Sequence, residues 1–127
     1  MMRVPSDLSY TQDHEWLKFD AEGNAMVGIT DYAQNSLGDI TYVEVPEAGQ
    51  TFSAGETFGV VESVKAASDL FMPVDGEILA VNEGLNDTPE QVNQSPYEGG
   101  WIIRIKATNP DQLTALLSPE AYEKQTG

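Results

Sequence analysis

The chain of 127 residues has no cysteine, one histidine, and six basic residues against 21 acidic ones. The absence of cysteine excludes disulfides, thiolate metal sites and cysteine nucleophiles. A formal net charge of −15 disfavours nucleic acids and membranes as partners, because phosphate backbones and anionic lipids would repel it. The charge fits either simple solubility or docking on basic surfaces of partner proteins. Composition alone does not separate these two interpretations.

Long apolar runs are also missing, and no stretch approaches the length of a transmembrane helix. The N-terminal sequence MMRVPSDLSY has neither the apolar core of a secretory signal nor the arginine-rich pattern of a transit peptide. A cytoplasmic location is therefore expected. The length fits a single domain over residues 1–127, large enough to form a core without a metal or disulfide staple.

No recognisable set of catalytic residues is present. His14 is the only histidine and no serine lies in a G-x-S-x-G motif, which disfavours a Ser-His-Asp hydrolase. A single histidine gives weak support for a metal site, and none is expected. Residues 98–101 (EGGW) have glycines but lack the lysine and hydroxyl residue of a phosphate-binding loop. We therefore expect a protein that is not an enzyme and has no catalytic residue of its own.

What the chain does contain is a series of short strands separated by turn residues, typical of a small, mainly β sandwich or barrel. Residues 21–24 (AEGN) predict a hairpin turn, since the spacing of a calcium-binding loop is absent there. Residues 40–45 predict a further strand. The segment GDITYVEVPEAG, from Gly38, resembles GEILAVNEGLND, from Gly76, at a constant offset. Such a repeat would pair two similar β units about a pseudo-twofold axis.

Four helix starts are indicated by capping residues. Thr30 is expected to cap a short helix over residues 31–37, which ends at Gly38. At the other three starts a polar residue precedes a proline, which fits the first helical position. These pairs are Thr88–Pro89, Asn109–Pro110 and Ser118–Pro119.

The segment VESVKAASDL, residues 61–70, holds Lys65, one of only four lysines. Val60 and Val61 predict a strand before this lysine, and Phe71 and Val74 predict another after it. Lys65 is thus expected at the tip of a connection between two strands. Most lysines are simply solvated surface residues. The tip position and the small neighbouring residues instead favour covalent attachment of a prosthetic arm, whose cofactor would supply chemistry that the protein lacks.

Seven stretches, in order, resemble the H protein family of the glycine cleavage system, whose members are lipoyl-carrying shuttle proteins. The resemblance extends from about Tyr10 to Tyr122, nearly the whole chain. The stretches are HEW (14–16), GITDYAQNSLGDI (28–40), VEVPEAG (43–49), ESVKAASDL (62–70), PVDGEI (73–78), VNEGL (81–85) and PYEGGW (96–101).

The resemblance implies a barrel-sandwich hybrid of two small sheets, with short flanking helices and a C-terminal helical tail. It implies that lipoate is amide-linked to Lys65. Glu62, three residues before this lysine, and Gly76, eleven after it, match positions that help the lipoate-attaching enzyme. Glu15 and Asp69 match positions near a cleft for the arm and its cationic aminomethyl cargo.

The function implied by the resemblance is a carrier that moves an aminomethyl unit and reducing equivalents between three enzymes. These are a pyridoxal-phosphate glycine decarboxylase, a folate-dependent aminomethyltransferase and dihydrolipoamide dehydrogenase. The carrier would catalyse none of the steps and is expected to be monomeric. Asp13 and Ser36 depart from the family pattern, and both departures concern the resting pocket of the arm.

Four other interpretations remain open. A lipoyl domain of a 2-oxoacid dehydrogenase shares the hairpin, but such domains are shorter and lack the HEW motif and the helical tail. A biotin carrier would have methionines beside the lysine, where this chain has Val64 and Ala66. An H-like protein that relays lipoate to other enzymes would need the same hairpin. An unmodified acidic interaction domain is supported only by the composition.

Overall fold

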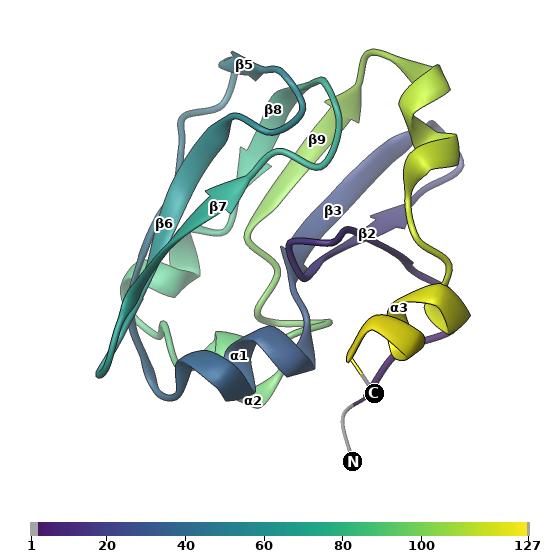
Figure 1. The fold of residues 1–127 in the computed structure, drawn as a ribbon. Coiled ribbons are helices and arrows are strands. Elements are labelled where there is room, and N and C mark those ends of the chain that lie inside the picture. Colours follow the sequence, from purple (N-terminus) through teal and green to yellow (C-terminus); the bar gives the residue numbers. More distant parts are fainter. Residues whose placement is uncertain (1–2, 127) are drawn as a thin grey trace.

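Two antiparallel β-sheets form the body of the protein, shown in Figure 1 as a computed structural model that describes residues 3–126. The larger sheet has the strand order β1-β2-β3-β9-β8-β5, and the smaller has the order β4-β6-β7. The strands are β1 (Ser9–Tyr10), β2 (Glu15–Phe19), β3 (Asn24–Ile29), β4 (Ile40–Glu44), β5 (Thr51–Phe52), β6 (Thr57–Ser63), β7 (Ala67–Phe71), β8 (Gly76–Val81) and β9 (Ile103–Ala107). The predicted mainly β fold of two small sheets is confirmed.

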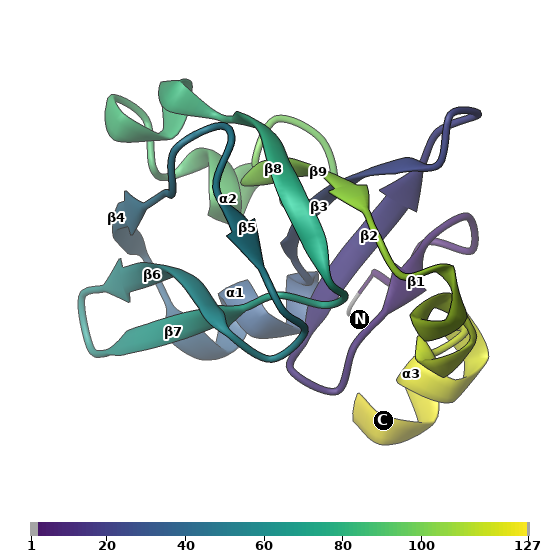
Figure 2. The same ribbon diagram turned by 90° about the horizontal axis from the view of Figure 1, so that it is seen from above.

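Short helices flank the two sheets. They are α1 (Asp31–Leu37), α2 (Gln91–Gln94) and α3 (Pro119–Thr126), with 3₁₀ turns η1 (Glu83–Asn86) and η2 (Pro110–Ala115). Figure 2 shows α3 beside β1, on the side of the molecule away from the β6–β7 hairpin. None of the helices within residues 3–126 is long and apolar enough to cross a membrane.

The main core contains alternate apolar residues of both sheets, because successive side chains of a strand point to opposite faces. Representative members with no exposed surface are Leu17, Val27, Val43, Ile78 and Ile105. A second cluster is mainly aromatic and is formed by Leu8, Tyr10, Trp16, Tyr97 and Tyr122. The second cluster joins the N-terminal strands to α3, since Tyr10 and Tyr122 stack with ring centroids 4.7 Å apart.

The predicted hairpin at residues 21–24 is confirmed. Gly23 takes the left-handed conformation with φ of 84°, which glycine adopts at little cost. The Asp20 carboxylate accepts hydrogen bonds from the backbone N–H groups of Glu22 (2.8 Å) and Asn24 (3.0 Å). These acids therefore stabilise a turn. In the part of the chain that the structure describes, no group of three His, Cys, Asp or Glu residues is placed to hold a metal ion.

Two of the four predicted caps form as expected. The Thr30 side chain accepts a hydrogen bond from the Ala33 N–H (3.2 Å), and α1 ends at Gly38, whose φ is 83°. The Ser118 hydroxyl likewise accepts from the Ala121 N–H (3.2 Å), at the start of α3. Each cap satisfies an N–H group that has no partner within its own helix.

The other two caps were wrong in detail. The helix α2 begins at Gln91, two residues after Pro89, and the Thr88 hydroxyl donates to the Gly84 carbonyl (3.0 Å) of the preceding turn. Asn109 precedes a 3₁₀ turn and forms no side-chain cap. Neither side chain accepts a capping hydrogen bond from the helix or turn that follows it.

The two segments of the proposed repeat both form strands, β4 and β8, but these lie in different sheets. Ile40 and Ile78 occupy equivalent positions and are both buried. The two glycines differ. Gly38 has a positive φ, whereas Gly76 does not and is an ordinary strand residue. The two similar segments therefore form similar strands, but the backbone conformation of the glycine that precedes or begins each strand differs.

The pairing of Gly28 with Trp16 gives a prediction about stability. A Cβ atom at Gly28 would lie 2.7 Å from the indole ring, and Trp16 is 1% exposed, with its Nε1 donating to the Pro96 carbonyl (2.9 Å). Gly28→Ala is expected to lower the free energy of unfolding by about 3 kcal/mol, measured by urea denaturation, because the buried ring has no room to move.

A matched control is available in η1. A Cβ atom at Gly84 would approach only the Asn82 Oδ1, at 3.3 Å, and Gly84 is exposed. Gly84→Ala is expected to change the free energy of unfolding by less than about 1 kcal/mol. Equal effects of the two substitutions would contradict this account of Gly28.

Candidate functional site

The structure places Lys65 in the connection between β6 and β7, as the sequence predicted. These strands pair from Thr57 opposite Phe71 to Glu62 opposite Ala67, so that only a short tip remains. The tip of this hairpin lies at the lower left of Figure 1, away from the body of the molecule.

A serine closes this tip, which explains why it contains no glycine. The Ser63 N–H and hydroxyl both donate to the Ala66 carbonyl, at 2.8 and 3.1 Å. The same hydroxyl accepts from the N–H groups of Lys65 (3.3 Å) and Ala66 (3.1 Å). A serine that bonds nearby backbone groups in this way forms a local turn. The sequence interpretation missed this role of Ser63.

Lys65 and its neighbours are open to solvent. Val64 is 70% exposed, and Lys65 and Ala66 are also exposed. The two ion pairs found among residues 3–126 are Arg3–Glu98 and Arg104–Asp20, so no carboxylate in that range forms an ion pair with the Lys65 amine. The amine is therefore available to an enzyme that approaches the tip.

A cavity of about 230 Å³ lies beside this hairpin, between α1, β7 and the start of β2. Ser36 and Leu37, at the end of α1, and Ser68, near the start of β7, bring its lining close to the tip. Its full lining is Asp13, His14, Glu15, Ile29, Tyr32, Ala33, Ser36, Leu37, Val61, Ser68, Asp69 and Leu70. Both departures from the family pattern, Asp13 and Ser36, thus line this cavity.

Glu15 is the buried acid of the cavity, with 2% of its surface exposed. Its Oε2 accepts a hydrogen bond from the Phe71 N–H (2.8 Å), and its Oε1 accepts one from the Thr11 hydroxyl (3.4 Å). Burial raises the pKa of Glu15 to about 8, with a further rise from the nearby Asp13 carboxylate, against the lowering effect of the two hydrogen bonds. Glu15 therefore exchanges a proton close to neutral pH.

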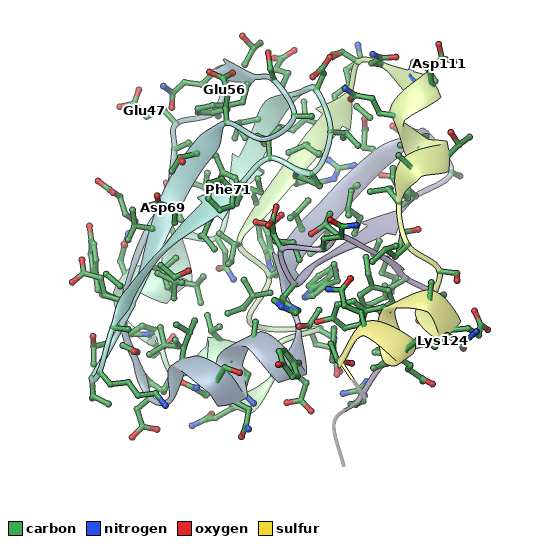
Figure 3. The ribbon with its side chains drawn as sticks, viewed as in Figure 1. Glu47, Glu56, Asp69, Phe71, Asp111 and Lys124 are labelled. Atoms are coloured by element: carbon green, nitrogen blue, oxygen red, sulfur yellow. The ribbon has the colours of Figure 1, made fainter. Side chains whose placement is uncertain are left out.

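Asp69 lines the same cavity but in a different environment. It is exposed, and alternation along β7 puts Leu70 on the buried face and Asp69 on the opposite one, where it pairs with Val60. Figure 3 labels Asp69 and Phe71 on this strand. Asp69 thus belongs to the rim of the cavity, whereas Glu15 lies in its wall.

Glu62 and Gly76 are far apart in the structure. Glu62 is exposed on β6, close to the tip. Gly76 is buried and pairs with Phe52 of β5, at the top of Figure 1 and at the opposite end from the hairpin tip. A Cβ atom at Gly76 would lie 2.9 Å from the Lys106 carbonyl, so glycine is needed for the close approach of β8 and β9.

His14 is a site residue that the sequence interpretation left without a role. Its Nδ1 shares a hydrogen bond with the Tyr122 hydroxyl (2.9 Å), and its ring lies against Tyr32 with centroids 4.8 Å apart. The Tyr122 hydroxyl also shares one with the Thr30 hydroxyl (2.6 Å). Burial lowers the pKa of His14, which favours the neutral ring. His14 therefore links α3 to the cavity and to the cap of α1.

No local pattern in the sequence indicates this network, because its members His14, Thr30 and Tyr122 come from separate parts of the chain. His14 also has a positive φ of 66°, the only such non-glycine residue within residues 3–126. The backbone at this position is held in that conformation by its surroundings, including the Thr30 N–H, which donates to the His14 carbonyl (3.0 Å).

Comparison with known proteins gives consistent results over nearly the whole chain. Residues 8–127 match the family model described as "Glycine cleavage H-protein". A protein named glycine cleavage system H protein from Opitutus terrae is 55% identical over 127 residues, covering all of both chains. One of the same name from Chromohalobacter salexigens is 54% identical over 123 residues, covering 97% of this chain and 94% of its own.

A solved structure agrees with the sequence comparisons. The crystal structure of a glycine cleavage system H protein from Mycobacterium marinum superposes on this chain with a TM-score of 0.86. The two are 38% identical in sequence, and the match covers 96% of this chain and 98% of the other. The similarity therefore includes both sheets and the flanking helices.

Proposed function

The chain belongs to the glycine cleavage H-protein family and is a lipoyl carrier of that system, and we propose that Lys65 is the residue that carries the lipoate. Members of the family are carriers and not themselves catalysts. The single observation that carries the proposal is the exposed lysine at the tip of a closed hairpin beside a cavity. When bound, lipoate supplies a dithiolane disulfide that accepts carbon units and electrons, which no side chain of this protein does.

The residues around Lys65 fit such an arm. Its amine is exposed and forms no ion pair with a carboxylate of residues 3–126, so it is open to acylation. The adjacent cavity has apolar walls, from Ile29, Leu37, Val61 and Leu70, that suit a hydrocarbon chain. Lys65 would hold the group covalently and the cavity would shelter it from water.

We assign to Glu15 and Asp69 the role of making the cavity favourable for a cationic group. A protonated amine beside Glu15 would favour its ionised form and lower its pKa, which offsets part of the cost of burying that carboxylate. Asp69, at the rim, would attract the same cation before it enters. Burial makes Glu15 the stronger contributor of the two, because exposed charges are screened by water.

Glu62 and Gly76 are the residues that we assign to recognition by the lipoate-attaching enzyme. Glu62 is exposed on the strand that leads to Lys65, so the enzyme can contact it directly. Gly76 is buried, so its contribution would be indirect, through the close packing of β8 on β9.

As a member of this family, the protein works with other components of the glycine cleavage system. We propose that these are glycine decarboxylase, aminomethyltransferase and dihydrolipoamide dehydrogenase. Glu44, Glu62 and Asp69 lie on exposed strand positions of the small sheet, which favours partners with basic surfaces around their active sites. A monomeric state and a cytoplasmic location stay predictions.

The test is the intact mass of the protein purified from cells supplied with lipoate, followed by peptide mapping. One lipoyl group per chain is expected, on the peptide that contains Lys65. Unmodified protein from cells that lipoylate their other carriers would contradict the proposal. A biotinyl mass on the same peptide would identify a biotin carrier instead.

A further inference from the structure

Asn93, in α2, binds the turn between α1 and β4. Its Nδ2 donates to the carbonyl of Gly38 (2.9 Å) and to the Oε1 of Gln34 (2.8 Å). Its Oδ1 accepts from the N–H of Ile40 (2.8 Å). One half-buried amide therefore holds two backbone groups on either side of residue 39.

The peptide unit between Asp39 and Ile40 connects this amide to the lysine hairpin. Its N–H is bound by Asn93, and its carbonyl accepts a hydrogen bond from the Val64 N–H (3.1 Å). Residues 3–126 contain no cis peptide bond, so the C=O and N–H of this unit point in opposite directions within one rigid plane. An amide fixed on one side of the plane thereby fixes the acceptor on the other side.

Lys65 itself lies against the same turn. A Cβ atom at Gly38 would be 3.5 Å from the Lys65 Cε and 4.0 Å from its Cδ, so the lysine stem crosses over this glycine. Gly38 has a φ of 83°, and its carbonyl is one of the groups that Asn93 holds. Two contacts of the hairpin tip, at Val64 and at Lys65, are therefore with backbone that Asn93 positions, and Ser63 pairs with Ile40 beside them.

We propose that Asn93 is a positioning residue for the lipoyl-lysine hairpin. It holds the turn at residues 38–40 so that Lys65 is presented from one fixed place to the lipoate-attaching enzyme. The tip closes itself through Ser63. Loss of Asn93 would leave the turn of the hairpin and the β4–β6 pairing intact but loosen the hold on the tip at Val64 and Lys65. This inference rests on Lys65 as the lipoylation site.

Amide hydrogen exchange of the unmodified protein, followed by NMR, tests the positioning directly. In Asn93→Ala the Val64 N–H is expected to exchange roughly tenfold faster relative to amides of the β3–β9 ladder, because its acceptor is no longer held. A residue that merely stabilised the whole fold would speed all of these amides together.

Asn82 provides a matched control. It is half-buried, and its Nδ2 donates to two backbone carbonyls, those of Gly99 (3.0 Å) and Trp101 (2.8 Å), neither of which belongs to the hairpin or to the 38–40 turn. Asn82→Ala is expected to leave Val64 exchange unchanged relative to the ladder. Equal effects of the two substitutions on Val64 would overturn the proposal.

The functional readout is the rate at which a lipoate–protein ligase, supplied with ATP and lipoic acid, modifies each unmodified variant. Asn93→Ala is expected to lower kcat/KM for the carrier about tenfold, mainly by raising KM, while Asn82→Ala leaves it unchanged. Asn93→Asp keeps the acceptor for Ile40 but places an oxygen against the Gly38 carbonyl and the Gln34 Oε1, and is also expected to raise KM and speed Val64 exchange.

Each result has a separate meaning. If Asn93→Ala does not fold, Val64 exchange in Asn93→Asp decides the question. Wild-type protein that the ligase does not modify on Lys65 would refute the proposed function. Wild-type protein modified on Lys65, with Val64 exchange and KM unchanged in the folded Asn93 variants, would refute the positioning role alone.

Discussion

Replacing Lys65 with arginine is expected to abolish lipoylation completely while leaving the fold intact. Attachment forms an amide between the carboxyl group of lipoate and the lysine amine. That step requires a neutral amine with a free electron pair. The guanidinium of arginine stays protonated and cannot form this amide under cellular conditions.

The folding of this variant should match that of the wild type. Lys65 is exposed, and its contact with Gly38 is made by the aliphatic stem, which arginine shares in large part. Surface substitutions of this kind usually change the free energy of unfolding by less than about 0.5 kcal/mol. A loss of the lipoyl mass would then result from the missing amine at position 65 and not from unfolding.

The measurement is intact mass after expression with lipoate, together with urea denaturation. Lys106→Arg is the control, because Lys106 is also exposed but lies on β9, and it should keep full lipoylation. A lipoyl group found on the Lys65→Arg chain would show that another lysine is the acceptor. Peptide mapping would then identify it among Lys18, Lys106 and Lys124.

Glu15→Gln is expected to make the protein more stable at pH 9, by on the order of 5 kcal/mol, and to remove a pH dependence. The pKa of Glu15 is about 8 in the folded protein, against an ordinary value of 4.5. Each unit of difference corresponds to about 1.4 kcal/mol. The amide of glutamine can still accept from the Phe71 N–H and, with its own N–H, donate to Thr11.

The sign follows from proton binding. Between about pH 4.5 and pH 8 the folded chain keeps a proton on Glu15 that the unfolded chain has lost. Stability therefore falls as the pH rises through this window, and levels off above it. This is opposite to the behaviour of a carboxylate held by an ion pair, whose pKa is lowered and whose contribution is lost in acid.

Urea denaturation at pH 5, 7 and 9 measures this difference. The wild type is expected to lose stability across the series relative to Glu15→Gln, with the two nearly equal at pH 5. Asp13→Asn serves as the control, since Asp13 is exposed, and its removal should change the slope only slightly. Parallel stability curves for the wild type and Glu15→Gln would show that Glu15 does not titrate in this range.

Local signals in the sequence were sufficient for much of the fold and for the place of Lys65. Apolar residues on both sides of the lysine predicted two strands, and the hairpin follows from them. The Thr30 and Ser118 hydroxyls accept from N–H groups three residues further along, so their caps formed as predicted. In each case the deciding contacts are made within a few residues.

Contacts between distant segments explain what sequence patterns did not reveal. The buried Glu15 accepts a hydrogen bond from Phe71, 56 residues later, and nothing in the surrounding HEW motif indicates that contact. Asn93 lies 55 residues from Gly38, and nothing in the sequence around this asparagine indicates the contact. The Thr88 hydroxyl donates to Gly84 and forms no cap, a contact that the Thr88–Pro89 pair does not indicate.

The hydrogen bond between His14 and Tyr122 joins residues 108 positions apart, nearly the full span of the chain. During synthesis the ribosome would release the β6–β7 hairpin long before it releases α3, because chains emerge from the N-terminus. The cavity wall at His14 is then complete only after α3 has been released and has packed against it. A chain that lacks α3 would display the lysine without a finished shelter for its arm, and α3 thereby ties the completed site to the late part of the chain.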